Sequence, residues 1–163
     1  MHRASRWIVA VVVLGGFFGV TTSPASAGGP GQPDVKISKH EKGPFSDALG
    51  QINIPGGVKK KVYFKVKTVA AGTLAIDVTG TGDGMLDDDY RIKWFRGSKN
   101  VTDKVAGVES HHISIDPGEV KRYEARVRHF DIQPDGITFC LQLVAAAPAN
   151  TDVASIGVNS PCT

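Results

Sequence analysis

The stretch KVYFKVK, residues 61–67, alternates apolar and polar side chains without a break. Successive side chains of a β-strand point to opposite faces of the sheet, so Val62, Phe64 and Val66 share one face. Tyr63 and the lysines share the other. This stretch therefore predicts a half-buried strand with an apolar inner side and a basic outer side.

The same two-residue period recurs in seven further stretches. They are DVKIS at 34–38, TLAIDVT at 73–79, YRIKWFR at 90–96, HISID at 112–116, KRYEARVR at 121–128, TFCLQLV at 138–144 and VASIGV at 153–158. Turn sequences such as PGG at 55–57 and QPDG at 133–136 separate them. Many short strands without intervening helices predict an all-β fold, an antiparallel sandwich of about seven to eight strands. Residues 39–53 are expected to be rich in loops, with room for one short edge strand.

The N-terminus has the organisation of a secretory signal peptide. Arg3 and Arg6 precede an apolar run at 7–20, and a short polar stretch then ends in the small residues Ala25-Ser26-Ala27. The apolar run is also shorter than the roughly 20 residues that a membrane-spanning helix needs. We therefore expect a cleaved signal peptide at 1–27, a flexible leader at 28–33 and one domain at 34–163, secreted and without a stable membrane span.

The charge balance argues against a nucleic-acid-binding protein. The chain has 19 Lys and Arg against 16 Asp and Glu, and Arg3 and Arg6 belong to the predicted leader, so 17 basic residues remain. The exported part is close to neutral, whereas nucleic-acid-binding domains are usually strongly basic.

One long passage resembles a known kind of module. Residues 90–128 contain a strand ending in Trp94-Phe95, a turn with Gly97, an NVT segment at 100–102 and a PGE segment at 117–119. This order is similar to that of an immunoglobulin-like module of bacterial secreted and surface proteins. The resemblance implies an immunoglobulin-like β-sandwich and a spacing, adhesion or accessory binding role, and it brings no catalytic residues.

The stretch TGTGDGMLDDDY, residues 79–90, raises the question of a metal loop. Calcium loops place carboxylates at alternating positions, and the aspartates here do not follow that spacing. A tight loop could still gather two of them with backbone carbonyls. A plain turn is the favoured interpretation, and Asp83, Asp87 and Asp89 are weak candidates for calcium ligands, with Asp88 between the last two.

No pattern in the sequence points to catalysis. His111 and His112 are adjacent, so on a strand they face opposite sides and cannot chelate together. Zinc-binding HExxH, C-x-x-C and the nucleophile-elbow motif G-x-S-x-G are absent from the sequence. We therefore expect neither an enzyme nor a bound cofactor.

The most informative surface feature is a basic ladder on one predicted strand. Lys59, Lys61, Lys65 and Lys67 share the outer side with Tyr63 in their middle. The arginines of 122–128 could enlarge this ladder if the two strands are neighbours. One interpretation is attraction to an anionic polymer or lipid surface, with the tyrosine stacking on a sugar. The other is that lysines protect the edge of a sheet against aggregation.

The two cysteines, Cys140 and Cys162, both lie in the predicted exported part. An even count in a secreted chain favours one disulfide. A hairpin between 138–144 and 153–158 would place Cys140 opposite a residue a few places before Cys162, so the C-terminal tail must curl back. The alternative is a buried Cys140 and a Cys162 on a disordered tail. A bridge would remove Cys140 from any mechanism with His129.

Three functions from different classes follow from these patterns. The preferred one is a secreted, non-catalytic protein with an interaction, envelope-binding or structural role. Its partner would be an anionic envelope polymer, a polysaccharide or another secreted protein, and the oligomeric state is left open. The alternatives are a calcium-dependent binding module and a small secreted hydrolase or inhibitor.

Overall fold

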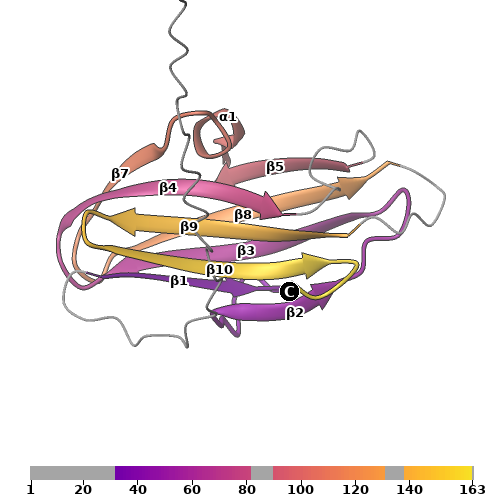
Figure 1. Cartoon of the computed structure of the whole chain (residues 1–163), viewed down its shortest axis with the longest axis horizontal. Coiled ribbons are helices and arrows are strands. Elements are labelled where there is room, and N and C mark those ends of the chain that lie inside the picture. The colour runs from indigo at the N-terminus through magenta and orange to yellow at the C-terminus, as the bar shows by residue number, and fades with distance from the viewer. Residues whose placement is uncertain (1–31, 82–89, 131–137, 163) are drawn as a thin grey trace, which may run out of the picture.

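A computed structural model describes residues 32–81, 90–130 and 138–162 of the chain. It is a sandwich of two five-stranded sheets (Figure 1). The first sheet has the order β1-β3-β8-β5-β6, and its strands are β1 (Pro33–Ser38), β3 (Lys59–Thr68), β8 (Val120–His129), β5 (Tyr90–Arg96) and β6 (Lys99–Asn100). The second has the order β2-β10-β9-β4-β7, and its strands are β2 (Ala48–Ile52), β10 (Asn150–Val158), β9 (Phe139–Ala147), β4 (Gly72–Thr81) and β7 (His111–Ile115).

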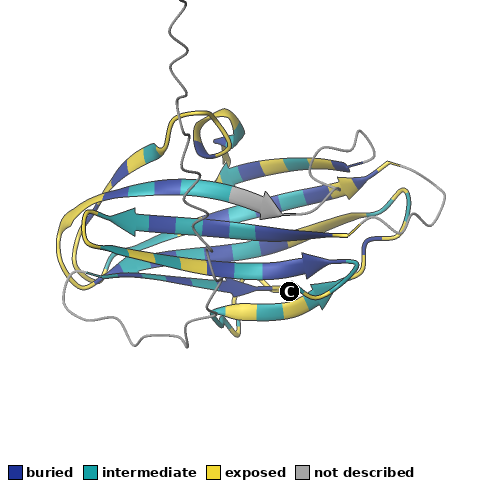
Figure 2. Ribbon diagram, viewed as in Figure 1, coloured by how far each residue is buried: buried dark blue, intermediate teal, exposed yellow. Residues whose placement is uncertain are grey.

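The predicted alternation is confirmed along the strands. Val62, Phe64 and Val66 of β3 are fully buried, and the residues between them are partly exposed. Figure 2 shows the same change from buried to less buried positions along β9 and β10. Side chains of the two inner faces form one core, in which the rings of Phe64 and Trp94 lie 5.3 Å apart. The core holds the two sheets together because burial of apolar surface drives folding.

The first sheet is joined to the second along β1. The backbone N–H of Val35 donates to Oδ2 of Asp152 on β10 at 2.6 Å, and Gln32 donates to Asn150 at 3.0 Å. These bonds satisfy polar groups at an open edge of the sandwich.

All eight predicted strands are present, and the structure adds two. One is β2, the short edge strand for which residues 39–53 had room, and the other is the two-residue β6. The sandwich is antiparallel as expected, except that β2 pairs with β10 in parallel. The alternation of β2 is weak, with a burial pattern of exposed and partly buried residues only, so the sequence did not indicate its partner.

A single helical turn, α1 (Thr102–Val105), follows β6 and was not predicted. Oγ1 of Thr102, the first residue of this turn, accepts a 2.9 Å hydrogen bond from the backbone N–H of Trp94. Val105, its last residue, is buried. One turn is too short to show a helical period, so tertiary contacts decide its conformation.

The predicted disulfide between Cys140 and Cys162 is confirmed, with Cα atoms 5.2 Å apart. Cys140 lies opposite Gly157 in the β9–β10 pairing, and the chain then reverses at Asn159, whose φ is 61°. A Cβ atom at Gly157 would stand 1.7 Å from the carbonyl oxygen of Ser160. Only glycine therefore allows the tail to return to Cys140.

A candidate anion-binding face

The cationic side chains are divided unequally between the two sheets. Every Lys and Arg within a strand belongs to the first sheet: Lys36, Lys59, Lys60, Lys61, Lys65, Lys67, Arg91, Lys93, Arg96, Lys99, Lys121, Arg122, Arg126 and Arg128. The strands of the second sheet contain no Lys or Arg, and their only carboxylates are Asp77 and Asp152. A chain whose charges nearly balance thus has one strongly charged sheet and one nearly uncharged sheet.

Ten of these cations project from the outer side of the first sheet, which we call the basic face. They are Lys36, Lys59, Lys61, Lys65, Lys67, Arg91, Lys93, Arg122, Arg126 and Arg128. In the described strands the same side carries two carboxylates, Asp34 and Glu124. Each cation is placed there by the same alternation that buries its neighbours in the core.

Strand register gathers the cations into rows across the sheet. Lys59, Arg128 and Arg91 are direct partners on β3, β8 and β5, and Lys61, Arg126 and Lys93 form the next row. The two rows lie about 7 Å apart along the strands, given a rise of about 3.3–3.4 Å per residue. Like charges directly opposite each other destabilise a sheet. The rows therefore work against stability, and packing alone gives no reason for them.

The position of β3 separates the two interpretations of its lysines. β3 lies between β1 and β8 in the first sheet, and its residues 63–67 are paired on both sides, whereas residues 59–62 are paired with β8 alone among the described strands. Protection of a sheet edge against aggregation therefore does not explain Lys65 and Lys67, which lie in the doubly paired part of β3. The arginines of β8 do enlarge the ladder, because β8 is the direct neighbour of β3.

Glu124 lies in the middle of the basic face, in one row with Tyr63 and Phe95. Burial opposes ionisation of its carboxyl group, but hydrogen bonds from Arg126 and Lys61 outweigh this, and together they lower the pKa of Glu124. Oε1 of Glu124 lies 3.3 Å from Nζ of Lys61. Glu124 thus offsets part of the charge at the centre of the face.

Phenylalanine rings lie against several of the cations. The guanidinium carbon of Arg126 is 3.7 Å from the ring centre of Phe95, and those of Arg91 and Arg128 are 5.1 and 4.7 Å from that of Phe130. Such contacts are attractive because the face of an aromatic ring is electron-rich. They orient the guanidinium groups and leave their net charge unchanged.

The half of the basic face nearest β1 is partly compensated. Lys36 pairs with Asp47 at 3.0 Å and with Asp34 at 3.5 Å. Nζ of Lys65 is 4.6 Å from the ring centre of Phe45. Burial and the positive charge of Lys67 lower the pKa of Lys65, although the carboxylate of Asp34 acts in the opposite direction.

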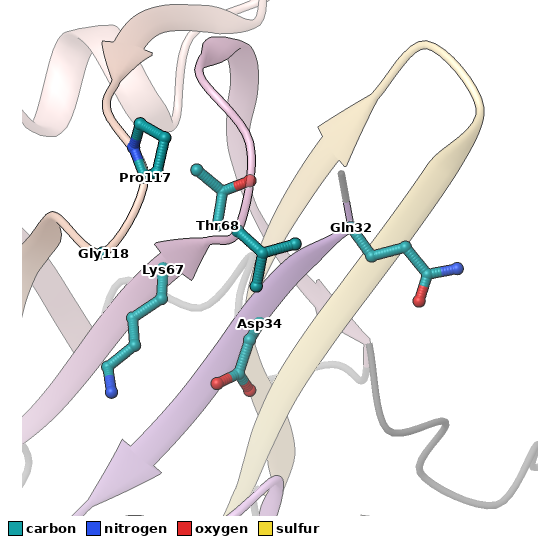
Figure 3. A pocket seen from close by; sticks show the side chains of 7 residues that line it. Gln32, Asp34, Lys67, Thr68, Pro117 and Gly118 are labelled. Carbon is teal, nitrogen blue, oxygen red and sulfur yellow. The ribbon is translucent and has the colours of Figure 1, made fainter. Parts of the chain in front are cut away.

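Two hollows lie at opposite ends of the first sheet. The larger, of about 520 Å³, is lined by Gln32, Asp34, Lys67, Thr68, Val69, Pro117 and Gly118. Figure 3 shows Asp34 and Lys67 on neighbouring strands there, so the single cation of this hollow stands beside a carboxylate. The smaller, of about 240 Å³, is lined by Lys59, Arg91, Lys93, Phe95, Arg126, Arg128 and Phe130. We call it the cationic hollow, because five of its seven lining residues are basic and none is acidic.

The predicted ladder is therefore spread over the whole length of the basic face. Lys59 lines the cationic hollow, and Lys67 lines the larger hollow that also contains Asp34. Tyr63 lies half-buried between them on β3. The ladder did not include Arg91, Lys93, Phe95 and Phe130, which come from β5 and from the residue after β8. The outward direction of Arg91, Lys93 and Phe95 was implied by the alternation of YRIKWFR, but the pairing of β5 with β8 was not.

Other candidate groups contribute nothing to this face. His129 is buried, its Nδ1 lies 2.9 Å from the carbonyl oxygen of Ile54, and its ring stacks on Tyr90 at 4.3 Å. It is a core histidine, and the disulfide removes Cys140 from any mechanism with it. His111 is partly buried and His112 exposed on β7 of the other sheet.

The calcium hypothesis stays a prediction. Asp83, Asp87, Asp88 and Asp89 lie outside the described residues. Within 32–81, 90–130 and 138–162, no three His, Cys, Asp or Glu side chains are grouped as metal ligands. Melting with and without calcium tests the loop, because a ligand that binds only the native state stabilises it.

Across the three described ranges, we find no helix with the length and apolar character needed to cross a membrane. The apolar run at 7–20 lies outside these ranges.

No protein-family model and no curated protein matches the chain. Solved structures similar to it include a family 123 glycoside hydrolase from Clostridium perfringens, at 7% identity over 78% of this chain and 27% of that chain, with a TM-score of 0.47. The N-terminal domain of PorA is 12% identical over 77% of this chain and 96% of that domain, with a TM-score of 0.44. A PapD-like domain of human CEP192 is 7% identical over 89% of this chain and 97% of that domain, with a TM-score of 0.43.

The chain spans about a quarter of the glycoside hydrolase chain that it resembles. These neighbours assign neither an activity nor a partner to this chain. The narrower resemblance, to modules of bacterial secreted and surface proteins, stays a prediction.

Proposed function

We propose that this protein is a secreted, non-catalytic binding domain whose basic face holds an anionic polysaccharide. The observation that carries the proposal is the gathering of ten Lys and Arg on the outer side of one sheet in a chain of nearly balanced charge. A surface of one sign attracts polyanions from a distance and raises their local concentration.

The shape of the face favours a polymer chain. The cations extend from the cationic hollow at one end of the first sheet to Lys67 at the other, along the length of β3. A long ligand can contact many of them at once. Tyr63 lies among them and offers a flat ring against which a sugar can pack.

The face is poorly suited to insertion into a lipid surface. Proteins that lie on membranes insert large apolar side chains beside their basic residues. The large apolar side chains most exposed in the described ranges are Val69, Val108, Phe130 and Val153. Only Phe130 stands among the arginines, and two guanidinium groups lie against its ring.

Charge reversal on β3 tests the proposal. Lys61→Glu, Lys65→Glu and Lys67→Glu together should abolish binding to fluorescein-labelled dextran sulfate, measured by anisotropy at low salt. Binding by the unchanged protein should weaken steadily as salt is added, because mobile ions screen exposed charges beyond about 10 Å at 0.1 M.

A matched control separates the basic face from the net charge. Lys39, Lys42 and Lys104 are the three lysines of the described chain outside strands. Changing all three to Glu alters the net charge by the same amount and should leave most of the affinity. Equal losses in both triple variants, or no binding by the unchanged protein at low salt, would refute the proposal.

Secretion has its own test. If residues 1–27 are a signal peptide, mass spectrometry of the protein from the culture medium should find Gly28 as the first residue. Retention of Met1 would contradict a cleaved leader.

A further inference from the structure

We propose that the cationic hollow is a site for a sulfate or phosphate ester group of the bound polymer, in preference to a carboxylate. This inference rests on the proposed function and names the chemical group that its ligand carries. It follows from the size of the hollow, from its charges and from the way in which its arginines are held.

The hollow is too small for a sugar chain and suits a single substituent. Its volume is about 240 Å³, below the range of about 300–1,000 Å³ typical of pockets for whole small molecules. A polymer that runs along the basic face would therefore place only a side group in it.

Cations reach the hollow from three adjacent strands. Lys59 comes from β3, Arg126 and Arg128 come from β8, and Arg91 and Lys93 come from β5. A carboxylate is planar, and one guanidinium group can satisfy both of its oxygens. A phosphate ester has three acceptor oxygens arranged around a tetrahedral centre, and a sulfate ester has the same shape. Donors from several directions match the tetrahedral group better.

Most of the positive charge in the hollow is unneutralised by the described part of the chain. Arg126 pairs with Glu124 through Nε, but no described carboxylate lies within 4.0 Å of Lys59, Arg91, Lys93 or Arg128. The larger hollow differs, because the carboxylate of Asp34 is part of its lining, whereas no lining residue of the cationic hollow is acidic. Among the described residues, an anion entering the cationic hollow therefore meets few competing carboxylates.

Aromatic contacts prepare the arginines without consuming their hydrogen-bond donors. Arg91 and Arg128 lie over the ring of Phe130, and Arg126 lies over that of Phe95. A ring occupies the flat face of a guanidinium group, whereas the N–H donors point outward in its plane. The ring thus restricts the side chain at no cost in charge, and preorganised groups lose less entropy on binding.

The test compares polymers that differ only in their anionic group. Dextran sulfate, phosphorylated dextran and carboxymethyl dextran, matched in chain length and in negative charge per sugar at the pH of the measurement, are titrated at two salt concentrations. The unchanged protein should bind the sulfated or phosphorylated polymer at least tenfold more tightly than the carboxymethylated one. The sulfated and phosphorylated arms show which ester is preferred.

Two double variants locate the preference. Arg91→Gln with Arg128→Gln should reduce the preference to near unity. Lys65→Gln with Arg122→Gln removes two cations from the other half of the same face, where both lie near Phe45. This control should lower the affinity for all three polymers by similar factors and keep the preference for the sulfated or phosphorylated polymer. Phe130→Leu, which leaves every charge in place, should reduce the preference partially, and melting curves establish that each variant is folded.

The outcomes distinguish this inference from the proposed function. Equal affinity of the unchanged protein for all three polymers would overturn the inference and leave the basic face as a polyanion-binding surface. A preference that survives in folded Arg91→Gln, Arg128→Gln protein would also overturn it. Absence of binding to every polymer would overturn both.

Discussion

The two sheets bury their inner sides equally well, with Phe64 and Trp94 on one side of the core and Leu143 and Ile156 on the other. Their outer sides differ. The first sheet presents ten cations, whereas the strands of the second sheet have no Lys or Arg and show small uncharged residues such as Ala75 and Val144. The disulfide also lies on the second sheet, at β9. The shared core and the disulfide stabilise the fold, whereas the outer side of the first sheet carries most of the charge of the described strands.

The largest expected effect separates stability from binding. Replacing Cys140 and Cys162 by alanine should lower the free energy of unfolding by about 3 kcal/mol, because the bridge restricts the unfolded chain. Urea denaturation measures the loss. Affinity for dextran sulfate should stay unchanged at temperatures where the variant is folded. A loss of binding in the folded variant would show that the two sheets are coupled.

The next effect should move stability and binding in opposite directions. Lys59 stands opposite Arg128, and Lys93 stands opposite Arg126. Lys59→Gln with Lys93→Gln should raise the free energy of unfolding by about 0.5–1 kcal/mol at low salt, since two repulsive cross-strand pairs are removed. Binding to dextran sulfate should weaken at the same time.

Salt provides a check on the origin of that effect. The gain in stability should disappear near 1 M salt, where charges are screened beyond about 3 Å. Lys42→Gln with Lys104→Gln is the control with equal net charge and should change stability much less. A gain that persists at high salt would have a cause other than repulsion.

Replacing Glu124 should have the opposite effects, a lower stability and a higher affinity. Its pKa is lowered in the folded protein, so its ionised form stabilises the fold above the unfolded pKa of about 4.3, and this contribution is lost as the pH falls through the lower folded pKa. Glu124→Gln should lower stability at neutral pH by about 0.5 kcal/mol and raise the affinity for dextran sulfate. Urea denaturation from pH 7 to pH 3 should show the two proteins converging in acid. A constant difference over this range would contradict the assignment.

The smallest effect concerns His111, which lies on β7 of the second sheet near cations of the first sheet and of α1. Burial lowers the pKa of His111, followed by the charges of Lys104 and Arg96. The unfolded chain therefore takes up this proton more readily, so stability should fall as the pH drops through about 6.5. His111→Gln should flatten this part of the stability profile between pH 7 and pH 5.5. An unchanged slope would rule out His111 as its source.

Local patterns were sufficient to predict the strands and the direction of their side chains. Alternation needs only the chain itself, because each residue of a strand turns its side chain to the face opposite its neighbour's. The outward direction of Lys61, Arg126 and Lys93 follows in this way from three separate stretches. Weak or very short patterns failed, as with β2 and α1, where partners elsewhere in the fold decide the conformation.

The sequence by itself determined a single β-sandwich with a period-two core, an outward row of lysines on β3 and a C-terminal disulfide. Only the tertiary structure decided that β3, β8 and β5 are neighbours, because hydrogen bonds between strands join backbone groups and do not depend on which side chains the strands carry. That order places residues 59, 91 and 128 in one row. The cationic hollow depends on this register, and no spacing within any one stretch of the chain encodes it.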